Sequence, residues 1–273
     1  MLLKRNLLNL SKLVIPLPSD SGRFTLNLVN KEKTMKHFLA ILACSTFIIH
    51  GAAAENFTGF TTLKKENLND ATFHGPANLE EVKAKSLVVQ GPLEFHGLTV
   101  ENDTKVMGPV SGSDKGTFGS LKVAGPFEGK NITSTKFEVK GPVEVTELTV
   151  NGKADIAGPL MAQQSHFQDL KVKGPVEVDN ITVKGETNII GPLDAKKSHF
   201  QNLEIKGDDV SLDDVDVKDI VIKGRTSNEQ VLQLKGKTIV SGTITFDSGR
   251  GVVEQGKEVK IQGEVKGGTV NKK

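Results

Sequence analysis

Apolar and polar residues alternate along most of the chain in short segments with a period of two. After Gly141, such segments are VEV at 143–145, LTV at 148–150 and ADI at 154–156, and the next glycine follows. A period of two predicts β-strands with one buried face, whereas an amphipathic helix would repeat every three to four residues. Each unit is therefore expected to contain three short strands and three corners.

Glycines, most of them followed by proline, divide these segments into units of 16 or 17 residues. The series extends back to Gly59. The expected repeat corners are Gly75, Gly91, Gly108, Gly125, Gly141, Gly158, Gly174, Gly191, Gly207 and Gly224. Glycine tolerates positive φ and proline favours a turn, so each glycine-proline pair is expected at a corner. The sequence also repeats over a distance of two units, because SHFQDLKVKG from Ser165 is followed 33 residues later by the similar SHFQNLEIKG from Ser198.

Strands this short must bury their inward face on the units above and below. Units of 16–17 residues are too short for helix-pair repeats. They predict an all-β fold, a single-stranded parallel β-helix (β-solenoid) with a roughly triangular section. A β-sandwich is the alternative, but sandwich strands do not repeat side chain for side chain. About ten coils at roughly 4.8 Å each predict a rod about 50 Å long.

The C-terminal residues change rhythm, because Gly242 and Gly263 are 21 residues apart while the alternation continues. The chain then ends in KGGTVNKK. Solenoids need atypical terminal units to cover their open strand edges. We therefore expect residues 55–241 to form the regular solenoid and 242–273 to form irregular terminal coils and a cap.

Residues 35–54 are typical of a secretory signal peptide, with a basic start, an apolar run and small residues at Ala52 and Ala54. Cleavage after Ala54 would make Glu55 the first mature residue. Residues 1–34 are then expected to be a spurious or disordered extension. A signal anchor is one alternative, although the apolar run is short for a bilayer span. A lipoprotein lipidated at Cys44 is the other.

Composition excludes several functions. The 35 basic and 33 acidic residues give a formal charge of +2, too small for the electrostatic field of a nucleic-acid-binding protein. The chain has neither Trp nor Tyr, so carbohydrate recognition would depend on polar groups. Its single cysteine lies in the signal segment, so the mature chain can form no disulfide, which suits a protein exported by a bacterium.

The repeats GPVEVTELTV, from Gly141, and GPVEVDNITV, from Gly174, resemble those of the bactofilins, bacterial polymer-forming proteins built from one short-coil β-helix. The resemblance covers residues 59–263 and depends on coil length and alternation. It implies self-assembly into filaments through the ends of the helix. Bactofilins generally lack a signal peptide, whereas this chain carries one.

Two groups of residues suggest metal binding. His166 and His199 occupy matching positions, but two coils separate them by roughly 9–10 Å, too far for one zinc ion. The acidic stretch 208–219 could hold calcium, yet it lacks the glycine-rich nonapeptide of calcium β-rolls. We expect structural roles for both groups, and neither a metal nor a cofactor.

The expected function is that of a non-catalytic exported structural or interaction protein, presenting a rigid rod in the bacterial envelope or outside the cell. A bactofilin-like polymer-forming scaffold and a polysaccharide-binding or polysaccharide-active protein are the alternatives. No catalytic motif appears, and the short coils leave no room for loops that carry a site. Broad faces suit contact with an envelope or polysaccharide surface, and self-association is expected through the N-terminal end, near Gly59.

Overall fold

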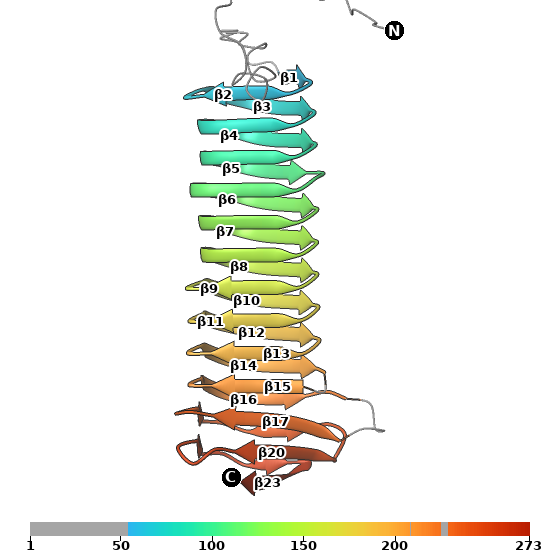
Figure 1. Ribbon diagram of the computed structural model, residues 1–273, viewed down its shortest axis with the longest axis vertical. Helices are drawn as coiled ribbons and strands as arrows, with labels where there is room; N and C mark the ends of the chain where they lie inside the picture. Colours follow the sequence, from blue (N-terminus) through green and yellow to red (C-terminus); the bar gives the residue numbers. More distant parts are fainter. Residues whose placement is uncertain (1–53, 208, 225–228) are drawn as a thin grey trace, which may run out of the picture. The chain divides into compact units, whose positions relative to one another are not determined.

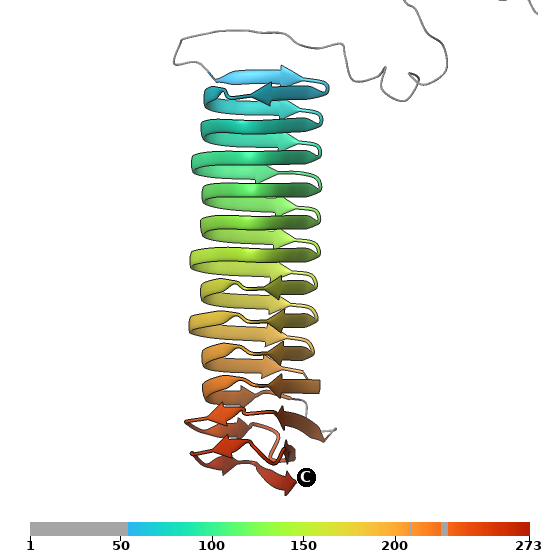
Figure 2. The ribbon, with the colours of Figure 1, turned by 60° about the vertical axis from the view of Figure 1, so that its left-hand side comes forward.

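The computed structural model describes residues 54–207, 209–224 and 229–273, which form an all-β parallel solenoid of about 13 turns. Its coils are stacked along one axis (Figures 1 and 2). Each strand pairs in parallel with the equivalent strands of neighbouring coils. The predicted fold class is confirmed. The predicted extension 1–34, most of the signal segment, Cys44 and Ala52 lie outside the described residues.

Each coil has three straight faces separated by three corners. In the coil that begins at Gly141, face 1 is 143–146, face 2 is 148–150 and face 3 is 154–157. Corner 1 joins faces 1 and 2, corner 2 joins faces 2 and 3, and the glycine-proline pair forms corner 3. All three faces of this coil are in register with those of the next coil.

The strands differ in length because some run through the corners. The first coils contain β1 (Glu55–Thr58), β2 (Thr61–Lys64) and β3 (Asn67–His74). Five long strands run around corners 1 and 2: β4 (Ala77–Gln90), β5 (Leu93–Val106), β6 (Val110–Ala124), β7 (Phe127–Lys140) and β8 (Val143–Ala157).

Corner 1 interrupts the strands in later coils, so that face 1 becomes a separate strand. The face 1 strands are β9 (Leu160–Gln163), β11 (Val176–Asp179), β13 (Leu193–Lys196) and β15 (Asp209–Asp213). Faces 2 and 3 are covered by β10 (His166–Lys173), β12 (Thr182–Ile190), β14 (His199–Lys206) and β16 (Asp216–Ile222). The last coils contain β17 (Gln230–Lys235), β18 (Ile239–Val240), β19 (Ile244–Phe246), β20 (Gly251–Gln255), β21 (Lys260–Ile261), β22 (Val265–Lys266) and β23 (Gly268–Lys272).

The core is a continuous apolar column inside the coils. Val145, Ile156 and Val178 are at most 2% exposed, whereas Glu144 and Glu177 point outward and are exposed. The alternation therefore predicted the inward and outward positions correctly. Each large apolar side chain that points inward stabilises the folded state by roughly 1.5–3 kcal/mol through its burial. Such side chains recur along the stack and hold neighbouring coils together.

Corner 3 needs glycine because neighbouring coils approach closely there. Gly158 has a φ of 155°, and a Cβ at this position would contact the carbonyl oxygen of Gly141 in the coil before it. Gly207 meets the Gly191 carbonyl in the same way. Gly224 differs, because its Cβ position faces the side chain of Gln230.

Corner 1 places one residue of almost every coil in the left-handed region, and glycine is rarely used there. The non-glycine residues are Lys65, Glu81, Asp114, Asn131, Glu147, Gln164, Asn180, Lys197 and Asp214, with φ between 48° and 60°. Such conformations are uncommon for residues with a Cβ. The repeated hydrogen bonds and core packing on both sides hold these residues in place.

Corner 2 accounts for most of the variation in coil length. It has two residues in the coil with Gln168 and Asp169, and three in the next coil, at 184–186, so the register shifts by one residue between these coils. The longer corner is held by Asp169, whose carboxylate accepts a hydrogen bond of 2.9 Å from the Glu186 amide. The faces therefore stay aligned although the coils differ in length.

The C-terminal residues continue the same stack with longer coils. Ile239 pairs with Lys260, and Val253 pairs with Val270. The stack therefore has more turns than the ten expected from the spaced glycines. The additional turns lack the glycine-proline signature, so the glycine spacing could not reveal them.

Candidate functional site

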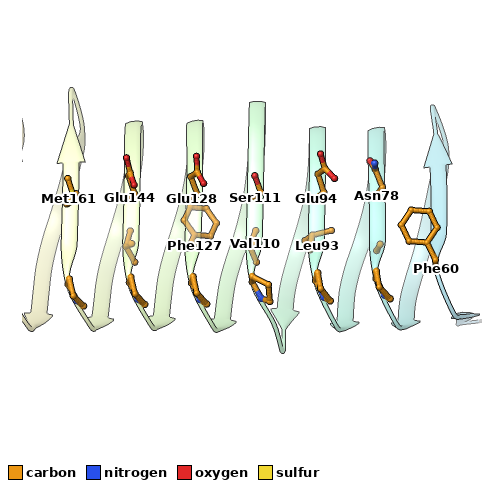
Figure 3. A pocket seen from close by; sticks show the side chains of 18 residues that line it. Phe60, Asn78, Leu93, Glu94, Val110, Ser111, Phe127, Glu128, Glu144 and Met161 are labelled. Carbon is orange, nitrogen blue, oxygen red and sulfur yellow. The ribbon is translucent and has the colours of Figure 1, made fainter. Parts of the chain in front are cut away.

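A shallow groove runs along the solenoid beside corner 3. It is lined by the prolines of successive coils from Pro76 to Pro159 and by the outward residues of face 1, with Phe60 and Met161 near its ends (Figure 3). A second groove begins at Pro159 and Met161 and continues along face 1 to Lys235. The two grooves share these residues and so form one continuous strip, here called the corner groove.

The prolines stack because corner 3 repeats in every coil. Eight coils in succession carry an exposed proline, and these residues are Pro76, Pro92, Pro109, Pro126, Pro142, Pro159, Pro175 and Pro192. Their carbonyl groups stay within the backbone ladder, since Leu160 N donates to Pro175 O at 2.9 Å. Proline has no amide hydrogen to leave unsatisfied, so the rings form an apolar ridge without disturbing the ladder.

A row of carboxylates accompanies this ridge. The outward residues of face 1 next to the prolines are Asn78, Glu94, Ser111, Glu128, Glu144, Met161, Glu177 and Asp194. Glu128 lies directly opposite Glu144, and Glu177 opposite Asp194, on neighbouring coils. Like charges opposite one another in a sheet are destabilising, so this row lowers the stability of the stack by a small amount.

Four of these carboxylates have no cationic partner within 4.0 Å among the residues that the structure describes: Glu94, Glu128, Glu144 and Glu177. Charged groups elsewhere on the surface do form pairs. Lys122 donates to Glu138 at 2.8 Å, and this hydrogen bond lowers the pKa of the Glu138 carboxyl. A hydrogen bond to Glu204 likewise raises the pKa of Lys223.

His166 and His199, considered above as a metal pair, lie in one outward column of face 2 with Thr182 between them. Both side chains are exposed. No group of three or more metal-binding side chains occurs within residues 54–273 apart from the gaps at 208 and 225–228. The two histidines occupy the same position in two similar coils, residues 158–173 and 191–206.

The serines before these histidines have a structural role. Ser165 is buried, donates to the Gln163 carbonyl at 2.7 Å and accepts a hydrogen bond of 3.0 Å from the Leu148 amide. Ser198 makes the equivalent bonds in the later coil. The hydroxyl group thus satisfies backbone groups of corner 1 in two consecutive coils.

The acidic stretch 208–219 also serves the corners, although Asp208 lies outside the described residues. The Asp214 carboxylate accepts a hydrogen bond of 2.8 Å from the Lys237 amide, and Asp219 accepts one of 2.8 Å from Thr243. These carboxylates hold the wider turns of the following coil. This agrees with the expected assignment to corners and outward faces.

At the predicted cleavage site, Ala54 is exposed and Glu55 is the first residue of β1, where it pairs with Ala71. In the part of the chain that the structure describes, no helix has the length and apolar character needed to cross a membrane.

The corner groove was not expected from the sequence, although five of the eight glycine-proline pairs are followed two positions later by an acidic residue, in GPLE, GPFE, GPVE (twice) and GPLD. The other three pairs have Asn78, Ser111 and Met161 at this position.

No family model matches the chain, and neither a curated protein nor a solved structure matches it. The fold and the surface therefore define the protein only as a parallel β-solenoid repeat protein with a proline-lined, acidic groove.

Proposed function

We propose that the protein is a non-catalytic structural or interaction protein, exported by a bacterium, that presents a rigid solenoid in the envelope or outside the cell. The observation that carries this proposal is the uniform stack, in which every coil repeats three faces in register. Such a stack is stiff because each coil is hydrogen-bonded to both neighbours. It places equivalent surface positions at a constant spacing.

Export is supported by the position of the first strand. Cleavage after Ala54 would remove the apolar segment and leave Glu55, where β1 begins. Processing at this bond would therefore leave the whole described solenoid intact.

The test is expression of the full chain in a bacterium, followed by cell fractionation and intact-mass analysis. The expected product is found in the envelope or the medium and begins at Glu55. A chain that keeps residues 35–54, or that carries a lipid on Cys44, would contradict this proposal. X-ray scattering and electron microscopy of the purified product should then show single rods.

A polymer-forming scaffold is the second candidate, supported by the apolar residues of the terminal coils. Phe57 and Leu63 are only partly buried at the N-terminal end, and Val270 is 38% exposed in β23. Strand edges with apolar side chains favour pairing with another chain. Association through the N-terminal end would give a head-to-head pair, and use of both ends would give filaments.

The variants Leu63→Lys and Val270→Lys distinguish these assemblies. If only the N-terminal edge is used, Leu63→Lys abolishes the pair and Val270→Lys has no effect. Filaments that either variant shortens would instead favour the polymer-forming scaffold. Analytical ultracentrifugation and electron microscopy measure both outcomes.

A further inference from the structure

The corner groove has the shape and charge of a docking site for an extended chain. It follows the solenoid axis, the exposed proline rings give it an apolar wall, and the charged residues that line its first part are all glutamates. The exposed proline rings offer an apolar surface on which a partner's apolar side chains can pack. The unpaired carboxylates beside it would attract a partner with positive charges.

The spacing of the coils selects the conformation of that partner. Equivalent positions repeat every ~4.8 Å, or every ~9.6 Å for two coils. A polyproline II segment repeats the same face every three residues, which is ~9.3 Å, so it stays in step along the groove to within ~1 Å over six coil intervals. An α-helix with its ~5.4 Å turn drifts by ~3–4 Å over the same length. A β-strand, with a same-face repeat of ~6.7 Å, is out of step with each coil.

Two pairs of the carboxylates show the same two-coil spacing, while Glu128 and Glu144, between the pairs, lie on neighbouring coils. Glu94 and Glu128 lie two coils apart, with the uncharged Ser111 between them. Glu144 and Glu177 are also two coils apart, with Met161 between them. Basic residues three positions apart on a polyproline II segment would face either pair, while the intervening prolines would pack on the proline ridge.

We infer that the corner groove binds an extended, proline-rich segment of a partner protein in the polyproline II conformation, with a lysine or arginine at every third residue. This inference rests on the proposed function of the solenoid as a non-catalytic interaction protein, and it specifies the partner's chemistry. Charge complementarity sets the preference for basic residues, and the coil spacing sets their separation.

The experiment measures binding of fluorescent peptides to the full chain by anisotropy. One peptide has the sequence KPPKPPKPP. The control peptide KKKPPPPPP has the same composition and charge, but its basic residues are contiguous. The spaced peptide is expected to bind at least tenfold more tightly, and added salt should weaken its binding because the contacts are exposed ion pairs.

Two matched pairs of variants locate the binding site. Changing Glu94, Glu128, Glu144 and Glu177 together to Gln should weaken binding of the spaced peptide at least tenfold. The control changes the exposed carboxylates Glu101, Glu147, Glu229 and Glu258 to Gln, which alters the net charge by the same amount. Its affinity for the spaced peptide should stay within twofold of that of the parent protein.

The second pair tests the apolar wall. Met161→Lys, in the groove, should weaken binding at least tenfold. Met107→Lys, which is on face 3 and is similarly exposed at 41% against 48%, should not change it.

Equal binding of the two peptides would overturn the inference, because it would show attraction by charge alone. Binding that survives the four groove substitutions would also overturn it. A glucosamine oligomer is the third probe, and binding of this cationic sugar without binding of the spaced peptide would assign the groove to a glycan. If no probe binds to samples that are still single rods in the microscope, the inference fails while the proposed function stands.

Discussion

The ring of Phe95 lies over Gly112, the equivalent residue of the next coil, and occupies the space that a side chain there would fill. Phe95 is 1% exposed, and its ring meets that of Phe118 edge-on at 5.6 Å. A large residue in one coil is thus matched by the absence of a side chain in the next. The core is therefore packed between coils as well as within them.

This relationship predicts a strong coupling between the two positions. Gly112→Ala should destabilise the protein by about 1–3 kcal/mol, because the new Cβ overlaps a buried ring. Adding Phe95→Leu should recover part of the loss, although that substitution alone is destabilising. A double-mutant cycle from urea unfolding measures the coupling, and strictly additive effects would contradict the packing described here.

Ser165→Ala should cost about 1–3 kcal/mol, because it leaves the Leu148 amide and the Gln163 carbonyl without their hydroxyl partner. The control is Ser111→Ala on the exposed face 1, which should change stability by less than about 0.5 kcal/mol. Thermal or urea unfolding measures both. Equal effects of the two substitutions would mean that the buried hydroxyl is not needed at corner 1.

Glu147→Val should destabilise the protein by at least about 1–2 kcal/mol, since Glu147 has a φ of 60° and a β-branched residue is disfavoured there. Glu144→Val, three residues earlier on the extended face 1, is the matched control and should be nearly neutral. Glu147→Asn should also be tolerated. A neutral Glu147→Val would show that corner 1 adopts another conformation in solution.

Val178→Asp should cost several kcal/mol, because it places an unpaired charge in the apolar column. Glu177→Lys, one residue away and exposed, should have little effect on the melting temperature. Circular dichroism melts compare the two. If both variants melted alike, the assignment of inward and outward residues would be wrong.

Lys122→Ala should reduce stability slightly at neutral pH, by less than about 1 kcal/mol for such an exposed pair. The hydrogen bond from Lys122 lowers the pKa of Glu138 in the folded protein. Its stabilising effect is therefore present above the ordinary glutamate pKa of about 4.3 and is lost as the pH falls through the lowered value. Urea unfolding from pH 7 to 3 should show the variant converging on the parent, while Lys115→Ala, at an exposed corner, should show no such trend.

The regular part of the fold could be predicted because alternation and glycine spacing act on every coil alike. Val145 points inward and Glu144 outward because neighbouring residues of a strand lie on opposite faces, and the alternation of apolar and polar residues shows this directly. The left-handed conformation at corner 1 was not predicted, since its residues include Lys65, Glu81 and Gln164, polar side chains that do not by themselves favour a positive φ.

The corner groove was also missed, for a different reason. It is a property of several coils together, and it appears only when residues 16 or 17 positions apart are placed in contact. The number of the last coils, from β17 onward, was not predicted, because their length varies and glycine-proline pairs no longer mark their beginning.

The two forms of corner 2 have a consequence for how such a chain can evolve. Between residues 135 and 202 the short and long forms alternate from coil to coil, so a pair of coils, such as residues 158–190, contains one of each. After duplication or loss of one such pair in the gene, a coil with a long corner 2 still stacks on a coil with a short one. The contacts between neighbouring coils are therefore of the same kinds as before. The SHFQDLKVKG and SHFQNLEIKG segments, which lie one such pair apart and are identical at seven of ten positions, fit a past duplication of this kind. The length of the rod can therefore change during evolution in steps of about 10 Å, the height of two coils. Such a change needs no rearrangement of the core.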